Sequence, residues 1–94
     1  MKSTIGYKIV LVDDEIDLCE ICAEVLRAQG HQVSSFHNVE SVLREAGSSM
    51  DLVITDLRLS GASGVQLAED LSFRLIQEKK PTVPILFISG HGEG

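Results

Sequence analysis

Apolar residues along this chain fall into two alternating patterns, short continuous runs and longer repeats with a helical period. Four runs have the length of strands, and they occupy residues 8–12, 32–36, 52–55 and 85–88. Three of them are β-branched or aromatic and almost wholly apolar, whereas 32–36 is of mixed polarity. Between the runs, apolar residues recur three and four positions apart, as they do on one face of a helix. The pattern therefore predicts four strands that alternate with three helices.

Residues typical of helix ends bound the three helical segments. The expected ends are Asp14 and Gly30 for the first helix, Asn38 and Gly47 for the second, and an S-x-x-Q capping box of Ser63 and Gln66 for the start of the third. The residues expected to face inward are Leu18, Ile21, Cys22, Val25 and Leu26, then Val39, Val42, Leu43 and Ala46, then Val65, Ala68, Leu71 and Leu75. Residues 58–62 are expected to form a loop.

Regular alternation of strands and helices predicts an α/β fold, a doubly wound parallel sheet with helices on both faces. The first and third runs are the most apolar early ones and belong at the centre, while the polar second run belongs at an edge. These preferences give the strand order 2-1-3-4, numbered along the chain. In such sheets ligands bind at the carboxyl ends of the strands, here beside the first and third.

Acidic residues stand where these strands end. Asp13 and Asp14 follow the first strand, Asp56 follows the third, and Ser89 with Gly90 follows the fourth. Three carboxylates at one edge repel one another unless a cation joins them, and hard oxygen ligands suit Mg²⁺. Taken singly, the aspartates could cap a helix or end a solvated strand, and the serine could be an ordinary loop hydroxyl. Their coincidence at one edge favours a site for a divalent metal and an anionic substrate.

The stretches VLVDDEID, VITDLRLSGASGVQL and PILFISG resemble the receiver domain of two-component response regulators, over residues 9–94. The resemblance implies a flavodoxin-like fold and makes Asp56 the phosphoacceptor. It implies that Mg²⁺ is held by Asp13, Asp14, Asp56 and the backbone carbonyl of Arg58. It also implies that Ser89 and Gly90 contact the phosphoryl group.

The function implied by the resemblance is a phosphorelay in which Asp56 takes a phosphoryl group from a sensor histidine kinase or a phosphotransfer protein. Such a module catalyses its own phosphorylation and is not a turnover enzyme. Two alternatives remain: a receiver-like interaction module that is not phosphorylated, and a magnesium-dependent phosphohydrolase with an aspartate nucleophile. The second is disfavoured because those enzymes place another acid where Arg58 stands. Arg58 and His91 are hypothesised to tune the lifetime of the phosphoaspartate.

The chain departs from the family's pattern at two places. Ser60 stands where many members have proline, and residues 1–94 correspond to a partial receiver domain that lacks the final helix-strand-helix and its phosphoryl-binding lysine. Lys79 and Lys80 cannot replace that lysine, because they follow the third helix at the opposite edge of the sheet. Strand 85–88 is then expected to be an exposed edge, and we expect a homodimer across it.

Composition and charge limit the classes of binding partner and the cellular location that are expected. The chain has 94 residues, is 44% hydrophobic and 23% charged, and its net charge of -6 argues against binding to nucleic acid. No signal peptide or membrane span is predicted, which suggests a cytoplasmic protein. Cys19 and Cys22 form a C-x-x-C inside a helix. We interpret both as small buried hydrophobes, since a redox pair needs a helix start and zinc needs more ligands.

Overall fold

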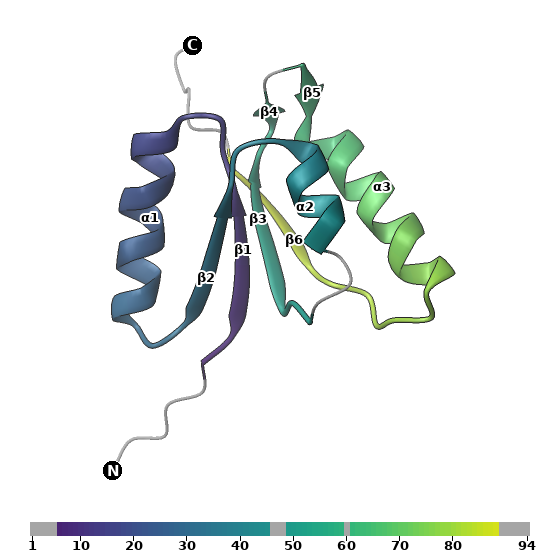
Figure 1. The fold of residues 1–94 in the computed structure, drawn as a ribbon, viewed down its shortest axis with the longest axis horizontal. Coiled ribbons are helices and arrows are strands. Elements are labelled where there is room, and N and C mark those ends of the chain that lie inside the picture. The colour runs from purple at the N-terminus through teal and green to yellow at the C-terminus, as the bar shows by residue number, and fades with distance from the viewer. Residues whose placement is uncertain (1–5, 46–48, 60, 89–94) are drawn as a thin grey trace.

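The computed structural model describes residues 6–45, 49–59 and 61–88. Its elements are, in chain order, β1 (Lys8–Val12), α1 (Ile16–Ala28), β2 (Gln32–Phe36), α2 (Val39–Glu45), β3 (Leu52–Asp56), β4 (Arg58–Leu59), β5 (Ala62–Ser63), α3 (Gly64–Gln77) and β6 (Ile85–Ile88). Four strands form a parallel sheet in the order β2-β1-β3-β6. Helix α1 covers one face and α2 and α3 lie on the other (Figure 1). The predicted doubly wound sheet and its strand order are confirmed.

Strand register brings the ends of β1 and β3 to one edge of the sheet. Val12 is paired with Thr55 across the two central strands, so the residues that follow each of them emerge side by side. Asp56, the last residue of β3, is paired with Ile88 of β6. The hairpin of β4 and β5 lies at this same edge (Figure 1). This is the carboxyl edge, where doubly wound sheets bind ligands.

The core has two parts because successive residues of a strand point to opposite faces. Val10 and Val12 of β1 belong to the larger part, under α2 and α3, while Leu11 belongs to the smaller part, under α1. The other buried residues of the larger part are Val42, Met50, Val53, Leu59, Leu67, Leu71 and Leu75. The sheet is thus held mainly from the side of α2 and α3.

Helix α1 packs on a face other than the predicted one. Cys19 and Ala23 are 1% and 0% exposed, whereas the predicted inward residues Ile21 and Val25 are 59% and 57% exposed. Leu18 is exposed too. Of the predicted set, Cys22 packs against the smaller part of the core and Leu26 is partly buried. Small side chains let a helix approach a sheet closely, which explains why the cysteine and the alanine occupy the contact.

The predicted carboxyl end of α1 is confirmed, whereas the residue predicted to cap its amino end is wrong. The residue before the helix is Glu15, not Asp14, and it makes no side-chain capping hydrogen bond. At the other end Gly30 has φ 99° and its N–H donates to the carbonyl of Arg27 at 2.9 Å. Glycine adopts this left-handed conformation at little cost, so it terminates the helix as expected.

Two further expectations change in the second half of the chain. Residues 58–62 are predicted to form a loop, but β4 and β5 pair as a short antiparallel hairpin. Burial of Leu59, which is 6% exposed, holds the hairpin against the core. In α3 the inward row is Leu67, Leu71 and Leu75 with Ala68 partly buried, and Val65 is exposed instead. At the outer strand β6 the expectation of an exposed edge holds, since Leu86 and Phe87 are 51% and 38% exposed.

Helix α2 begins as predicted. The side-chain oxygen Oδ1 of Asn38 accepts a hydrogen bond from the N–H of Ser41 at 2.9 Å. This bond satisfies one of the backbone donors that have no partner within a first helical turn. Val42 is buried, and Val39 and Leu43 pack beside it. Ala46 and Gly47 lie outside the described residues, so their predicted roles remain predictions.

Helix α3 depends on Ser63 at its start. The hydroxyl of Ser63 accepts from the N–H of Gln66 at 3.0 Å, while the Gln66 side chain donates to Asp70 instead of reaching back. We expect Ser63→Ala to lower the free energy of unfolding by about 1 kcal/mol, because that N–H loses its partner. Ser72→Ala on an exposed position of the same helix is the control. Equal denaturation midpoints for the two variants would contradict the capping role.

Candidate functional site

Three aspartates meet at the carboxyl edge of the sheet. Asp13, Asp14 and Asp56 each offer a carboxylate oxygen, and these oxygens lie within 4.8 Å of one another. Asp13 and Asp56 are only 4% and 2% exposed, while Asp14 stays accessible to solvent. The sheet topology produces this cluster, because β1 and β3 are adjacent and parallel. We refer to these residues as the acidic cluster.

Asp13 is held by hydrogen bonds on its backbone and on its side chain. Its N–H donates to the carbonyl of Phe36 at 3.1 Å, which continues the pairing of β1 with β2 by one residue. Its carboxylate oxygen Oδ1 accepts from the N–H of Glu15 at 2.9 Å. The carbonyl oxygen of Asp13 lies 2.9 Å from Nδ1 of His37. The buried carboxylate therefore has a defined position at the end of β1.

Hydrogen bonds hold the backbone on both sides of Asp56. The next residue, Leu57, donates its N–H to Ile88 of β6 at 3.0 Å, and Thr55 Oγ1 donates to the Asp56 carbonyl at 2.9 Å. Oδ1 of Asp56 accepts a long hydrogen bond of 3.4 Å from the N–H of Arg58. The backbone of Arg58 is thereby placed beside the acidic cluster. The resemblance to receiver domains implies that the carbonyl of Arg58 is a metal ligand, which remains a prediction.

The chemistry of the donor set fits a small divalent cation. Three carboxylates in such proximity repel one another, and two of them are shielded from water, so a cation between them removes that repulsion. Oxygen donors with an open, solvent-accessible side are the kind of site that Mg²⁺ occupies while keeping some of its water. The acidic cluster can therefore hold a metal and present an ionised carboxylate to an anionic substrate.

The other residues discussed from the sequence fall into two groups. Ser89, Gly90 and His91 fall outside the described residues, so their roles as phosphoryl contacts or neighbours remain predictions. Lys79 and Lys80 follow the carboxyl end of α3, at the opposite edge of the sheet, as expected (Figure 1). The ammonium of Lys80 pairs with Glu78 at 3.1 Å.

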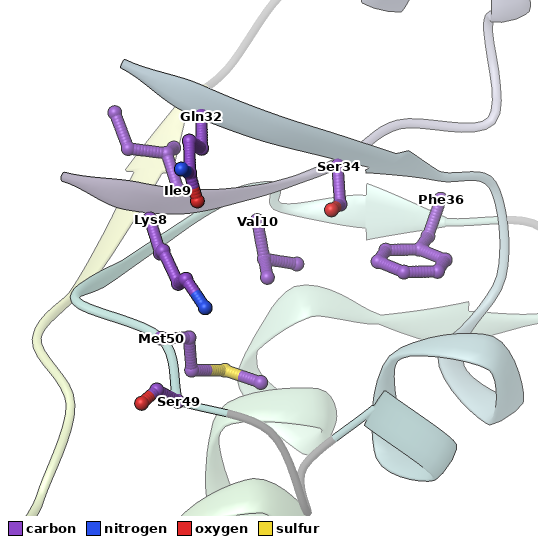
Figure 2. A pocket seen from close by; sticks show the side chains of 8 residues that line it. All are labelled: Lys8, Ile9, Val10, Gln32, Ser34, Phe36, Ser49 and Met50. Carbon is purple, nitrogen blue, oxygen red and sulfur yellow. The ribbon is translucent and has the colours of Figure 1, made fainter. Parts of the chain in front are cut away.

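A hollow of about 190 Å³ lies between the sheet and the segment that leads into β3. Figure 2 shows Val10, Phe36 and Met50 directed into it, with Lys8 and Ser34 among the polar residues around them. None of the three clustered aspartates lines this hollow. It lies beside β1 and β2, below the carboxyl edge, and is separate from the acidic cluster.

The two cysteines are free thiols in the structure. Burial raises the pKa of the Cys19 thiol, and the nearby carboxylate of Asp13 acts in the same direction. A redox-active cysteine needs a lowered pKa so that thiolate is present. Cys19 therefore serves as a small core residue, in agreement with the interpretation from the sequence.

Comparison with known proteins decides the family. A family model described as the response regulator receiver domain matches residues 9–94. The chain belongs to this family. The C4-dicarboxylate transport transcriptional regulatory protein DctD of Rhizobium meliloti is 35% identical over 88 residues, which are 90% of this chain and 18% of that protein.

Solved receiver structures share the fold. The non-phosphorylated HemR receiver domain of Leptospira biflexa has a TM-score of 0.75 at 28% identity, covering 95% of this chain and 68% of that one. A response regulator of Burkholderia pseudomallei, solved with a phosphorylated aspartic acid, calcium ion and citrate, has a TM-score of 0.77 at 25% identity. That alignment covers 94% of this chain and 49% of the other.

The receiver match covers only part of the related proteins. The curated relatives are longer, and the matched segment spans 18% of DctD and 34% of the uncharacterized regulator YrkP of Bacillus subtilis. Within the described part of the chain, none of the helices has the length and apolar character that crossing a membrane requires.

Three residues around the receiver's acidic cluster were not predicted from the sequence. His37 and Thr55 donate hydrogen bonds to the cluster's backbone, and Gly64 lies against the backbone of Asp56. A histidine after a strand, a threonine within one and a glycine after a cap have many common uses. Only their approach to the aspartates in three dimensions distinguishes them.

Proposed function

We propose that this receiver accepts a phosphoryl group on Asp56 in a magnesium-dependent phosphorelay. The observation that carries the proposal is the meeting of three carboxylates at the carboxyl edge, one of them the last residue of β3. The donor is proposed to be a phosphohistidine of a sensor histidine kinase or phosphotransfer protein. The related structure with a phosphorylated aspartic acid and a calcium ion supports both the modification and the cation.

In the proposed reaction a carboxylate oxygen of Asp56 attacks phosphorus. The new O–P bond forms as the bond from phosphorus to the donor nitrogen breaks, and the nitrogen keeps that electron pair. Asp13, Asp14, Asp56 and the backbone carbonyl of Arg58 are the residues proposed to hold Mg²⁺. When bound, the cation supplies positive charge against the phosphoryl oxygens. Ser89 and Gly90 are proposed to contact the transferred group.

The chain's own groups prepare this step by holding the nucleophile. The β3–β6 pairing and the Thr55 hydroxyl restrain the backbone of Asp56, which limits the positions that its carboxylate can take. The N–H of Arg58 donates to Oδ1 of Asp56. We propose that the module modifies itself and turns over no free substrate, and that it works in the cytoplasm.

Acetyl phosphate provides the direct test. Incubation of the protein with acetyl phosphate and Mg²⁺, read by intact mass, is expected to add one phosphoryl group, and EDTA is expected to prevent it. Beryllofluoride with Mg²⁺ offers a second readout through NMR shifts around Asp56. No mass change and no shifts would support the alternative of an unphosphorylated interaction module, and continuous release of phosphate would indicate a hydrolase. Arg58, at the position of a hydrolase's second acid, argues against the last outcome.

We expect millimolar Mg²⁺ to raise the thermal midpoint and Asp14→Ala to remove most of that effect. A ligand bound only by the native state adds about 1.4 kcal/mol at ten times its Kd, which shifts a small domain by roughly 4–8 °C per kcal/mol. Asp17→Ala, an exposed acid one helical turn away, is the matched control and should keep the shift. Melting curves that ignore Mg²⁺ would contradict the site.

We also propose that the 94-residue chain forms a homodimer across β6. In the described part of the chain β6 is the outer strand of the sheet, and its exposed Leu86 adds apolar area to an unpaired edge. Light scattering over a concentration series is expected to show a rising mass, and Leu86→Lys is expected to lower it. The control is Val65→Lys, which adds the same charge at an exposed apolar residue of α3. A monomer at high micromolar concentration would contradict the proposal.

A further inference from the structure

His37 makes a hydrogen bond to the backbone of the acidic cluster. The residue follows β2, is partly buried, and places Nδ1 at 2.9 Å from the carbonyl oxygen of Asp13, 24 positions earlier in the chain. A carbonyl oxygen can only accept a hydrogen bond, so Nδ1 carries the proton and donates it. Both the neutral ring with its proton on Nδ1 and the charged ring can make this bond.

The bonded carbonyl belongs to the peptide that joins Asp13 to Asp14. Because a peptide is planar, a hydrogen bond to its oxygen also restrains the direction in which the chain leaves toward Asp14. The Asp13 N–H is already bonded to Phe36, the residue before His37. The end of β2 therefore holds Asp13 from both of its peptide groups.

This restraint matters most for Asp14. Asp13 and Asp56 are buried at strand ends, whereas Asp14 lies between β1 and α1, is open to solvent, and precedes the N-cap residue Glu15. Like charges favour a conformation in which Asp14 turns away from the other two carboxylates. A fixed peptide before Asp14 limits that movement and keeps the three oxygens together without the cation.

We propose that His37 is a positioning residue for the divalent cation: it holds the Asp13–Asp14 peptide so that both carboxylates face Asp56. The ring makes its contact with the backbone and is not a ligand. The inference rests on the proposed function only for the identity of the cation. It predicts that removing the donor weakens cation binding more than it weakens the apo fold.

The test is a titration of the purified chain with MgCl₂, followed by calorimetry or by amide NMR shifts of Asp13, Asp14 and Asp56. His37→Ala and His37→Phe both remove the donor, and phenylalanine keeps the ring volume if the alanine variant is too unstable. His37→Asn returns an N–H at the same place, because its amide nitrogen is attached to Cγ as Nδ1 is. His31→Ala is the control, since Nδ1 of His31 bonds to the N–H of Tyr7 at 3.2 Å.

We expect Ala and Phe at position 37 to raise the Mg²⁺ Kd about three- to tenfold, the scale of one hydrogen bond that orients a metal ligand. Asn should stay within about twofold of the wild type, and His31→Ala should leave Kd unchanged. A Kd unaffected by Phe, or raised as much by Asn as by Phe, would overturn the positioning role. If the wild type itself does not bind Mg²⁺, the proposed function is rejected together with the positioning role. If the wild type binds and only the variants depart from the expected pattern, the positioning role alone is rejected.

Discussion

Replacing Asp56 with asparagine is expected to abolish phosphorylation and leave the fold intact. The amide has the size of the carboxylate and fits the same buried position, but its neutral oxygen is a poor nucleophile. Without metal the variant should be no less stable than the wild type, because one of three mutually repelling charges has been removed. Intact mass after incubation with acetyl phosphate and Mg²⁺ measures the first effect, and thermal unfolding measures the second.

Asp51→Asn is the matched control for this experiment. Asp51 lies just before β3, at the opposite end of the strand from Asp56, where its Oδ2 accepts the N–H of Lys8 at 2.8 Å. The same chemical change there should leave phosphorylation at the wild-type level. A mass increase of wild-type size in Asp56→Asn would refute Asp56 as the phosphoacceptor, and peptide mapping would then show which residue carries the group.

Gly64→Ala is expected to be the most damaging conservative change near the site. A Cβ at this position would overlap the backbone carbonyl oxygen of Asp56 and would lie 3.2 Å from its carbonyl carbon and 3.3 Å from Thr55 Cγ2. Backbone atoms of a central strand cannot move aside as a flexible side chain can. We expect a loss of about 1–3 kcal/mol in the free energy of unfolding, typical of overpacking. Thermal or denaturant unfolding measures this loss. Phosphorylation is also expected to be slower, because Asp56 is displaced.

Gly61→Ala separates the close contact from the general cost of replacing glycine. Gly61 has φ 71°, which strains an alanine, but no atom lies within 4 Å of the added Cβ. Its expected cost is about 1 kcal/mol, and phosphorylation should be unaffected. If Gly64→Ala is no more damaging than Gly61→Ala, the close contact with Asp56 does not limit stability.

Predictions from the sequence succeeded where a residue's role depends on its near neighbours in the chain. Residues 8–12, 32–36 and 85–88 form strands with the predicted bounds, and Asn38 and Ser63 cap their helices, because these features arise from local propensity and hydrogen bonding. The acidic cluster was also predictable. Once the strands were known to be parallel, their order placed the residues after β1 and at the end of β3 at one edge.

Tertiary packing decided the features that periodicity leaves open. Helix α1 carries apolar residues around much of its circumference, so the pattern could not show that Cys19 and Ala23 face the sheet; the short distance to the sheet selected the small side chains. The hairpin formed because Leu59 reached the core. His37 donates a hydrogen bond to the carbonyl oxygen of Asp13, 24 positions away in the chain. Gly64 lies so close to the backbone of Asp56 that a Cβ would not fit. The acidic residues and the sheet edge that they share could thus be predicted from the sequence, whereas the groups that hold them in place could be identified only from the tertiary structure.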